Sequence, residues 1–220
     1  MDKLQIYNSA FNRTIHYLKQ PQYLVYIIIP AVVSGFLWSV KSLIEGIFSF
    51  ISLGESSFWN DLMFQVNYLF VLTLLSPIYG ILSRKIIESE TGVKTADGWK
   101  ELLNDIIRML LISAIILGIQ IVFIYPLYLI LWLVGLSSVS TIIGFFIEAV
   151  LVGFAFFDYG LEIQRTNVSE SLQFIKKQFI HCLIVGTIFL LVIKIPVLGL
   201  IVAPIILTVF ATLILTKLKI

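Results

Sequence analysis

Cysteine and histidine, the side chains that most often act as nucleophiles, bases or metal ligands, are scarce in this chain. The 220 residues include one cysteine, Cys182, and two histidines. They form no HxxxxD acyltransferase pair, no HExxH zinc motif and no Cys/His nucleophile arrangement, and the sequence has no Walker A motif. Cys182 has no second cysteine for a disulfide and matches no metal-ligand spacing. The sequence therefore predicts no enzyme activity, no catalytic residue, no metal site and no cofactor.

Ionisable residues inside long apolar runs point more strongly to function, because a charge in a lipid bilayer is costly. Lys194 stands two residues before Pro196 in the stretch LLVIKIPVLGLIVAPIILTVFAT. In a functional interpretation it places a positive charge on an anion path, beside backbone N–H groups that the break in the helix frees. In a structural interpretation its ammonium group reaches the outer lipid headgroups. Both interpretations stay open, and Lys194 is a candidate anion-binding residue.

Two of the three acidic residues in the apolar run 139–163 have predicted partners or roles. Glu148 lies near its middle and is expected to pair with Lys194 or Lys41, or to stay protonated in a helix interface. A carboxylate in an anion path would repel the anion, which favours a structural or proton-coupling role. Asp158 lies near the polar end of the run, and we expect it to form a salt bridge with Arg165 or with a neighbouring basic loop.

The composition is that of a membrane protein. Hydrophobic residues make up 59% of the chain and charged residues 13%, with a mean hydropathy of +1.02. A soluble domain contains about 25% charged residues. A single domain of this length has room for roughly four to six helical segments at ~20 residues per span. The net charge of only +2 gives no indication of nucleic-acid binding.

Six apolar runs alternate with links of different character. The short links contain no Lys or Arg, whereas thirteen of the fifteen basic residues lie at the open ends of three consecutive hairpins. Cytoplasmic loops are enriched in basic residues. We therefore expect both termini and both long loops in the cytoplasm, with lipid around the apolar runs. The runs cover residues 23–53, 62–82, 109–134, 139–163, 180–195 and 200–216.

The polar segments between these runs have helical patterns of their own. We interpret residues 1–220 as a single polytopic membrane domain. Besides the membrane runs, it contains an interfacial amphipathic helix over residues 1–20 and cytoplasmic helical loops over 83–108 and 164–179. In the last of these, Asn167 precedes Glu170 by three residues, which predicts a capping box at the start of a helix.

Prolines interrupt several runs, and a membrane helix tolerates proline where a local adjustment satisfies the freed carbonyl groups. Pro77 and Pro126 lie inside the second and third runs. Run 180–195 is ~24 Å long as a helix at ~1.5 Å per residue, which is shorter than the ~30 Å hydrocarbon layer. An apolar turn over Pro196–Gly199 follows it. We interpret the last two runs as a re-entrant hairpin of two half-depth helices.

Small residues four positions apart predict close packing between helices. Such pairs occur in three of the runs or at their ends, namely Ser76/Gly80, Ala114/Gly118 and Ala149/Gly153.

Four stretches, taken together, resemble the CysZ-type sulfate transporter family, which shares a domain with etoposide-induced membrane proteins. The likeness covers about residues 11–213 and rests on the order and spacing of the four stretches. They are PQYLVYIIIP with Pro21 and Pro30; SPIYGILSRKIIESETG with Pro77, Gly80 and Gly92; Asp158-Tyr159 followed by the capped helix; and the last hairpin with Pro196, Gly199 and Pro204.

The resemblance implies an all-α integral membrane protein with two long spanning helices and two hemi-penetrating hairpins, which forms a homo-oligomer. It implies sulfate uptake across the bacterial inner membrane for cysteine biosynthesis, without an ATPase of its own. In the family, the sulfate-binding region lies around the first proline, which makes Arg13, His16 and Lys19 candidate anion-binding residues beside Lys194.

The resemblance is incomplete at this region. His16 stands where the family has a basic residue, and Leu24 and Val25 stand where the family has an arginine pair. A dianion in a low-dielectric site needs fixed positive charge and N–H donors. Two functions therefore remain in competition: an anion permease, and a membrane scaffold or interaction protein of the same domain family that does not transport.

Overall fold

A computed structural model describes residues 3–23, 25–26, 28–33, 35, 75–93, 99–164, 166–195 and 198–218. All regular structure within these residues is helical, which confirms the all-α prediction for this part of the chain. Residues 21–33 and 75–91 are helical wherever they are described. The named helices are α1 (Lys3–Leu18), α4 (Trp99–Ile119), the π-helix η1 (Gln120–Ile124), α5 (Tyr125–Leu133), α6 (Ser137–Ile163), α7 (Val168–Lys177), α8 (Phe179–Val192) and α9 (Leu198–Leu218).

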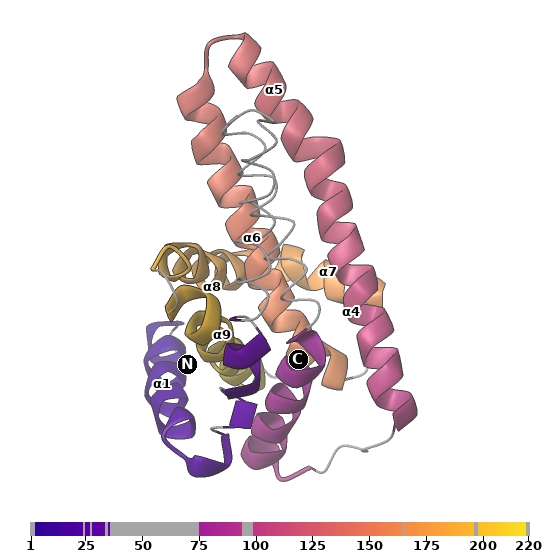
Figure 1. Ribbon diagram of the computed structural model, residues 1–220, viewed down its shortest axis with the longest axis vertical. Helices are drawn as coiled ribbons and strands as arrows, with labels where there is room; N and C mark the ends of the chain where they lie inside the picture. Colours follow the sequence, from indigo (N-terminus) through magenta and orange to yellow (C-terminus); the bar gives the residue numbers. More distant parts are fainter. Residues whose placement is uncertain are drawn as a thin grey trace.

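Helix α6 is the central element of the described fold. It contacts α4, α5, α7, α8 and α9, while α1 packs on α9. Figure 1 shows α4 and α5 as one long arm that runs antiparallel to α6, with the tip of this hairpin projecting beyond the other labelled helices. The tip contains Gly135, whose φ of 78° lies in the left-handed region that favours glycine.

The arm continues through Pro126 because the backbone changes its hydrogen-bonding pattern just before it. Proline has no N–H to donate, and its ring clashes with the carbonyl group four residues earlier. The π-helix η1 ends at Ile124, two residues before Pro126, and α5 starts at Tyr125. Such π-turns occur inside α-helices where the regular ladder is disturbed. The chain thus makes a local adjustment just before this proline.

Helices α6 and α8 approach so closely that two glycines are required. A Cβ atom added at Gly153 would lie 1.8 Å from the carbonyl oxygen of Cys182, and one at Gly186 would lie 1.7 Å from that of Ala149. The Ala149/Gly153 pair thus mediates helix packing, as predicted. At Gly80 and Gly118 an added Cβ would meet no described atom within 4 Å, so close packing at these two glycines stays a prediction.

The last hairpin differs in length from the predicted one. Helix α8 has 14 residues, or ~21 Å at ~1.5 Å per residue. Helix α9 has 21 residues, or ~32 Å, because it starts at Leu198 and continues through Pro204. The part of α9 that counts as apolar, Val202–Leu218, is shorter than a membrane span, so the re-entrant hairpin stays a prediction. The chain reverses from Ile193 onward, and Gly199 lies in the first turn of α9, where an added Cβ would lie 2.5 Å from the carbonyl oxygen of Val192.

One described helix, α6 over Thr141–Ile163, is long and apolar enough to cross a membrane by itself. Helices α7 and α8 meet the same criterion only together, and the chain bends by 90° between them. Shorter apolar helices cover Pro21–Val33 and Val202–Leu218. The runs 23–53 and 62–82 lie largely outside the described residues. The arrangement of three hairpins therefore stays a prediction.

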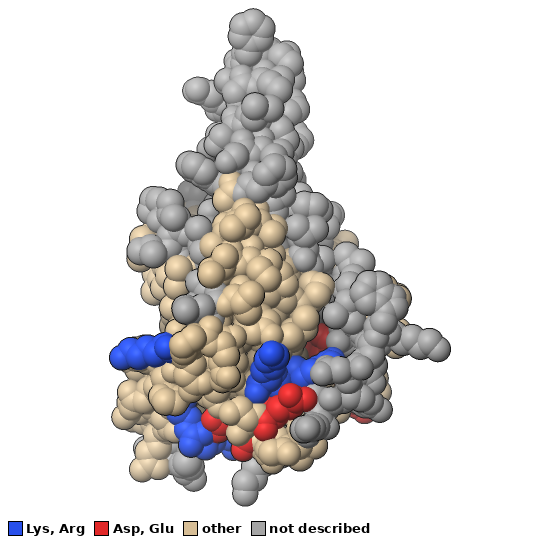
Figure 2. All heavy atoms as spheres, turned by 60° about the horizontal axis from the view of Figure 1, so that its bottom comes forward, with Lys and Arg blue, Asp and Glu red and all other residues tan. Residues whose placement is uncertain are grey.

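Charged and apolar side chains occupy different ends of the described structure. In Figure 2 the Lys, Arg, Asp and Glu side chains gather in a band across the lower part of the molecule, and the described surface above it is uncharged. Large apolar side chains of the α4–α6 hairpin are exposed, among them Phe123 at 67% and Leu133 at 69%. Exposed apolar area of this kind indicates contact with lipid or with another protein.

Candidate functional site

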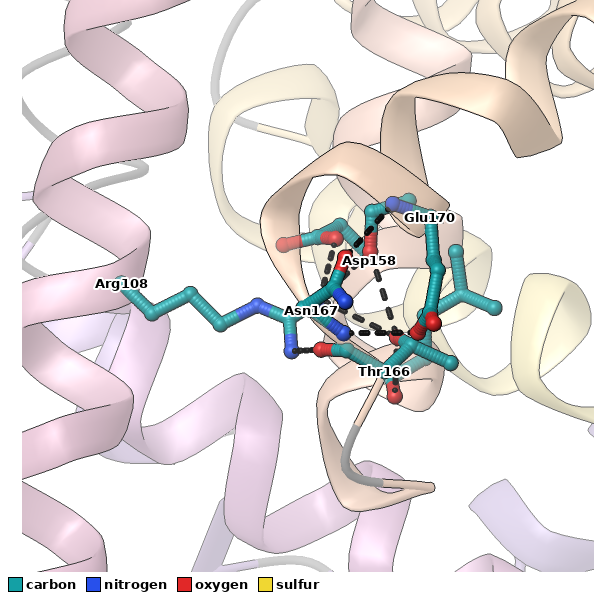
Figure 3. A network of polar contacts seen from close by, with 7 residues as sticks. Arg108, Asp158, Thr166, Asn167 and Glu170 are labelled. Atoms are coloured by element: carbon teal, nitrogen blue, oxygen red, sulfur yellow. Dashed lines mark hydrogen bonds and ion pairs between the residues drawn. The ribbon is translucent and has the colours of Figure 1, made fainter.

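A buried ion pair connects α4 with α6. Arg108 Nη2 donates to Asp158 Oδ1 at 2.8 Å, and Asp158 is 0% exposed. Figure 3 shows the Arg108 side chain reaching from its helix toward Asp158 and the start of α7. The predicted ion pair of Asp158 is confirmed, and its partner is Arg108. Arg165, the other partner considered, lies outside the described residues.

The Arg108 guanidinium has further acceptors in the segment that follows α6. Its Nη1 donates to the carbonyl oxygen of Thr166 at 2.6 Å, and its Nη2 donates to Ser171 Oγ at 2.6 Å. Thr166 Oγ1 in turn donates to the carbonyl oxygen of Leu161 at 2.9 Å. One arginine thus holds together α4, the polar end of α6 and the first turn of α7. We call Arg108, Asp158, Thr166 and Ser171 the Arg108 network.

Local sequence explains how Ser171 reaches this network. The Asn167 side chain accepts from the N–H of Glu170 at 2.9 Å, and the N–H of Asn167 donates to Glu170 Oε2 at 3.0 Å. The predicted capping box is therefore present, and it fixes the start of α7 at Val168. Ser171 lies one turn after Val168 and is fully buried, with its hydroxyl group at the Arg108 guanidinium.

The Arg108 network is electrically balanced but not saturated with hydrogen bonds. Asp158 Oδ2 and Arg108 Nε are buried and have no hydrogen-bond partner among the described residues. A buried ion pair needs such extra bonds to offset the desolvation of both charges. The arrangement suits a structural clamp. In the described part of the chain no group of three or more His, Cys, Asp or Glu side chains is placed to hold a metal ion.

Arg13, one of the predicted anion-binding residues, forms an ion pair with Glu90. The hydroxyl group of Tyr17 donates to the other oxygen of the same carboxylate, Glu90 Oε1, at 2.9 Å. Burial raises the pKa of Tyr17, so the hydroxyl stays a donor at neutral pH. These contacts connect α1 with helical residues 75–91. The charge of Arg13 is therefore shared with a carboxylate, which sequence reasoning did not anticipate.

The other predicted anion-binding residues are exposed. His16 lies in the last turn of α1 with its ring edge-on to Tyr17, and Lys19 follows directly after the helix. Lys194 is exposed in the turn after α8. The structure thus brings Arg13, His16 and Lys19 together on the last turns of one helix and the residue that follows it, while Lys194 lies on a different element.

The residues that carry the family resemblance occupy ends and contacts of helices. Pro21 is exposed where the second helical segment starts, and Pro30 is buried within it. Gly92 ends helical residues 75–91 with a φ of 72°, and its N–H donates to the carbonyl oxygen of Glu88 at 2.8 Å. Tyr159 is buried against the ring of Tyr79, with ring centroids 5.6 Å apart. Pro196 lies outside the described residues.

Two threonines of α9 bond carbonyl groups one turn earlier in the same helix, and one of them also bonds a residue far away along the chain. Thr208 Oγ1 donates to the carbonyl oxygen of Pro204 at 2.7 Å, and Thr212 Oγ1 donates to that of Thr208 at 2.7 Å. Thr212 also bonds Ser83, which joins α9 to helical residues 75–91. The carbonyl groups that these threonines bond belong to α9, which has the internal proline Pro204.

The remaining charged residues of the sequence analysis are described more briefly. Glu148 lies partly buried in α6. Lys85 Nζ lies 5.5 Å from the ring centroid of Tyr26, a cation–π contact. Lys41 lies outside the described residues.

Comparison with known proteins agrees with the helical architecture and with the predicted resemblance. The family model described as "Sulfate transporter CysZ/Etoposide-induced protein 2.4" matches residues 10–204, which is most of the chain. No curated protein matches the sequence. The matched region contains α4 to α8 and the Arg108 network. It also contains all four predicted anion-binding residues, Arg13, His16, Lys19 and Lys194. The chain therefore belongs to the CysZ/etoposide-induced protein 2.4 family of membrane proteins.

Proposed function

We propose that this protein mediates uptake of sulfate, or of a related small inorganic anion, across the bacterial inner membrane. The family match over residues 10–204 carries this proposal. The chain has no Walker A motif, so the flux would be passive or coupled to protons rather than driven by its own nucleotide hydrolysis. Sulfate taken up in this way would supply cysteine biosynthesis. We also propose that the protein acts as a homo-oligomer with both termini in the cytoplasm.

The proposed anion-binding residues contribute different charges. Arg13 is paired with Glu90, so it adds little net charge at the end of α1. His16 and Lys19 are exposed there, and only Lys19 of these two is charged when His16 is neutral. Lys194 is exposed and has no ion pair among the described residues. A dianion favours fixed cations over neutral donors. We therefore assign Lys194 and Lys19 the larger share of anion attraction.

Flux into proteoliposomes tests the proposal. Radiolabelled sulfate should accumulate faster in vesicles that contain the purified protein than in empty vesicles. Lys194→Ala should lower the rate if the ammonium group lines the path, whereas Lys217→Ala, which removes a lysine from the last turn of α9, should leave it unchanged. Folded protein that gives no flux above the empty vesicles would exclude sulfate transport.

A membrane scaffold that does not transport is the second function that a specific observation favours. Leu24 and Val25 replace the arginine pair of the family, and Val25 is 48% exposed. With Arg13 neutralised by Glu90, this region has less free positive charge than a sulfate site needs. Crosslinking in membranes should then recover a partner protein at fixed stoichiometry, together with null flux. Sulfate flux without such a partner would exclude the scaffold function and support the permease function.

A further inference from the structure

A basic cavity lies at the bend between α7 and α8, away from the predicted anion-binding residues. It has a volume of about 320 Å³. Residues from α1, from the end of α7 and from the start of α8 line it: Lys3, Lys176, Lys177, Gln178, Phe179, Ile180 and His181.

The described residues that line this cavity carry charge of one sign. They include three lysines and no carboxylate. Lys176 and Lys177 come from the last turn of α7, and Lys3 comes from the first turn of α1. The acidic residue of α7, Glu170, belongs to the capping box at the other end of that helix. Three ammonium groups around one cavity attract an anion with several oxygen atoms.

The start of α8 adds backbone donors to the cavity. Helix α8 starts at Phe179 without a side-chain cap, and the N–H groups of His181 and Cys182 donate to the carbonyl oxygen of Gln178. The N–H groups of Phe179 and Ile180 have no acceptor within the helix. The positive end of the helix dipole lies at the same place. His181 is buried, and its Nδ1 contacts the hydroxyl group of Tyr7, which holds the ring at the cavity. Lysine side chains and helix donors thus converge on one volume.

The cavity also has an apolar side. Phe179 is 49% exposed and Ile180 is 50% exposed, and both begin the apolar helix α8. Helix α7 has a polar face and meets α8 at 90°. When α8 enters a bilayer, such an amphipathic helix lies along its surface. The bend then lies at the depth of the lipid phosphates, with apolar side chains facing the acyl chains. A free inorganic anion would gain nothing from contact with these apolar side chains, whereas a lipid has acyl chains that pack against them.

From this combination we propose that the cavity binds the phosphate group of an anionic phospholipid and so anchors the α7–α8 bend at the membrane surface. The lysines neutralise the phosphate, the N–H groups of Phe179 and Ile180 bond its oxygen atoms, and the acyl chains lie along the side chains of the same two residues. This role requires no transport and holds for a permease and for a scaffold alike.

Binding of short-chain lipids to the purified protein in detergent tests this site. Dioctanoyl phosphatidylglycerol should bind in native mass spectra, and dioctanoyl phosphatidylcholine, which has no net charge, should bind at least about tenfold more weakly. Each lysine near an anionic surface contributes about a factor of five. Lys176→Gln/Lys177→Gln should therefore weaken phosphatidylglycerol binding at least about tenfold. Lys217→Gln/Lys219→Gln removes the same charge elsewhere and should leave the affinity unchanged.

The alternative outcomes overturn the proposal. Equal phosphatidylglycerol binding by the wild type and by the Lys176→Gln/Lys177→Gln variant would show that the cavity is not the site. Competition by inorganic phosphate or sulfate at concentrations similar to those of the lipid would assign the cavity to a free anion instead. Size-exclusion elution and circular dichroism of each variant confirm its fold. Salt provides an independent check, because raising the ionic strength should weaken binding to the wild type more than to the variant.

Discussion

At the scale of single residues, the Arg108 network joins three helices through buried polar contacts. Its two charges lie in a region where Asp158 is fully buried, and the Arg108 side chain is 13% exposed. Removing one partner from a buried ion pair leaves an uncompensated charge, whereas replacing both by apolar residues is often neutral. Substituting Asp158 alone, and substituting Arg108 and Asp158 together, therefore distinguishes a structural clamp from a contact that does not affect stability.

Asp158→Ala should lower the free energy of unfolding by roughly 3–5 kcal/mol, because it leaves the Arg108 guanidinium buried without a counter-charge. Titration with SDS in mixed micelles, followed by circular dichroism, measures this loss. The double variant Arg108→Met/Asp158→Leu should recover most of it. A double variant as unstable as the sum of the two single variants would contradict the clamp.

Asn167→Ala should cost about 1 kcal/mol of stability, because the N–H of Glu170 loses its acceptor at the start of α7. Asn167→Asp keeps an acceptor oxygen at the cap and serves as the matched control. The same SDS titration measures both variants. Equal loss in both would show that the amide group is needed for something other than the cap.

At the scale of helices, the contact between α6 and α8 decides how the last hairpin is placed. Gly153 and Gly186 face each other across this contact. A Cβ atom added at either glycine would lie less than 2 Å from a carbonyl oxygen of the other helix. Backbone atoms cannot move aside as a side chain does, so a larger residue must separate the two helices. Close approach through small residues is a general way of packing helices in lipid.

Gly186→Ala should destabilise the protein by about 1–3 kcal/mol or more through overpacking, although alanine favours a helix over glycine. Gly80→Ala is the matched control, because no described atom lies within 4 Å of its added Cβ. It should be neutral or slightly stabilising. Thermal unfolding in detergent compares the two variants. A Gly186→Ala protein as stable as Gly80→Ala would show that α6 and α8 are further apart than described here.

At the scale of the whole molecule, the charged side chains on the face shown in Figure 2 gather toward its lower end, and the tip of the α4–α6 hairpin projects from the upper end in Figure 1. This separation agrees with the basic links expected in the cytoplasm. The orientation in the membrane is nevertheless a prediction, based on the excess of basic residues at one end of each hairpin.

Labelling of introduced cysteines tests the orientation. Ser138→Cys at the start of α6 and Gln173→Cys in α7 place thiols at two exposed positions. A membrane-impermeant maleimide added to spheroplasts should label the first and not the second, because basic segments stay inside. Cys182 is buried and gives little background. The reverse labelling pattern would exclude cytoplasmic termini.

Local patterns in the sequence determined much of this protein. The helical class, the capping box of Asn167 and Glu170 and the adjustment before Pro126 all depend on residues within one or two helical turns. The spacing of Ala149 and Gly153 predicted a close contact, and the position of Asp158 at the end of an apolar run predicted an ion pair. Each of these follows from helix geometry or from the cost of burying a charge, which a single segment already reveals.

Only the tertiary structure decided which residues meet. Arg108 and Asp158 are 50 positions apart, Arg13 and Glu90 are 77 apart, and Tyr7 and His181 are 174 apart. No periodicity links residues at such separations, because their contact depends on how α1, α4, α6 and α8 pack. The same packing gathered three lysines around one cavity. The sequence thus determined the helices and their chemistry, and the packing between helices determined the partners of each charge.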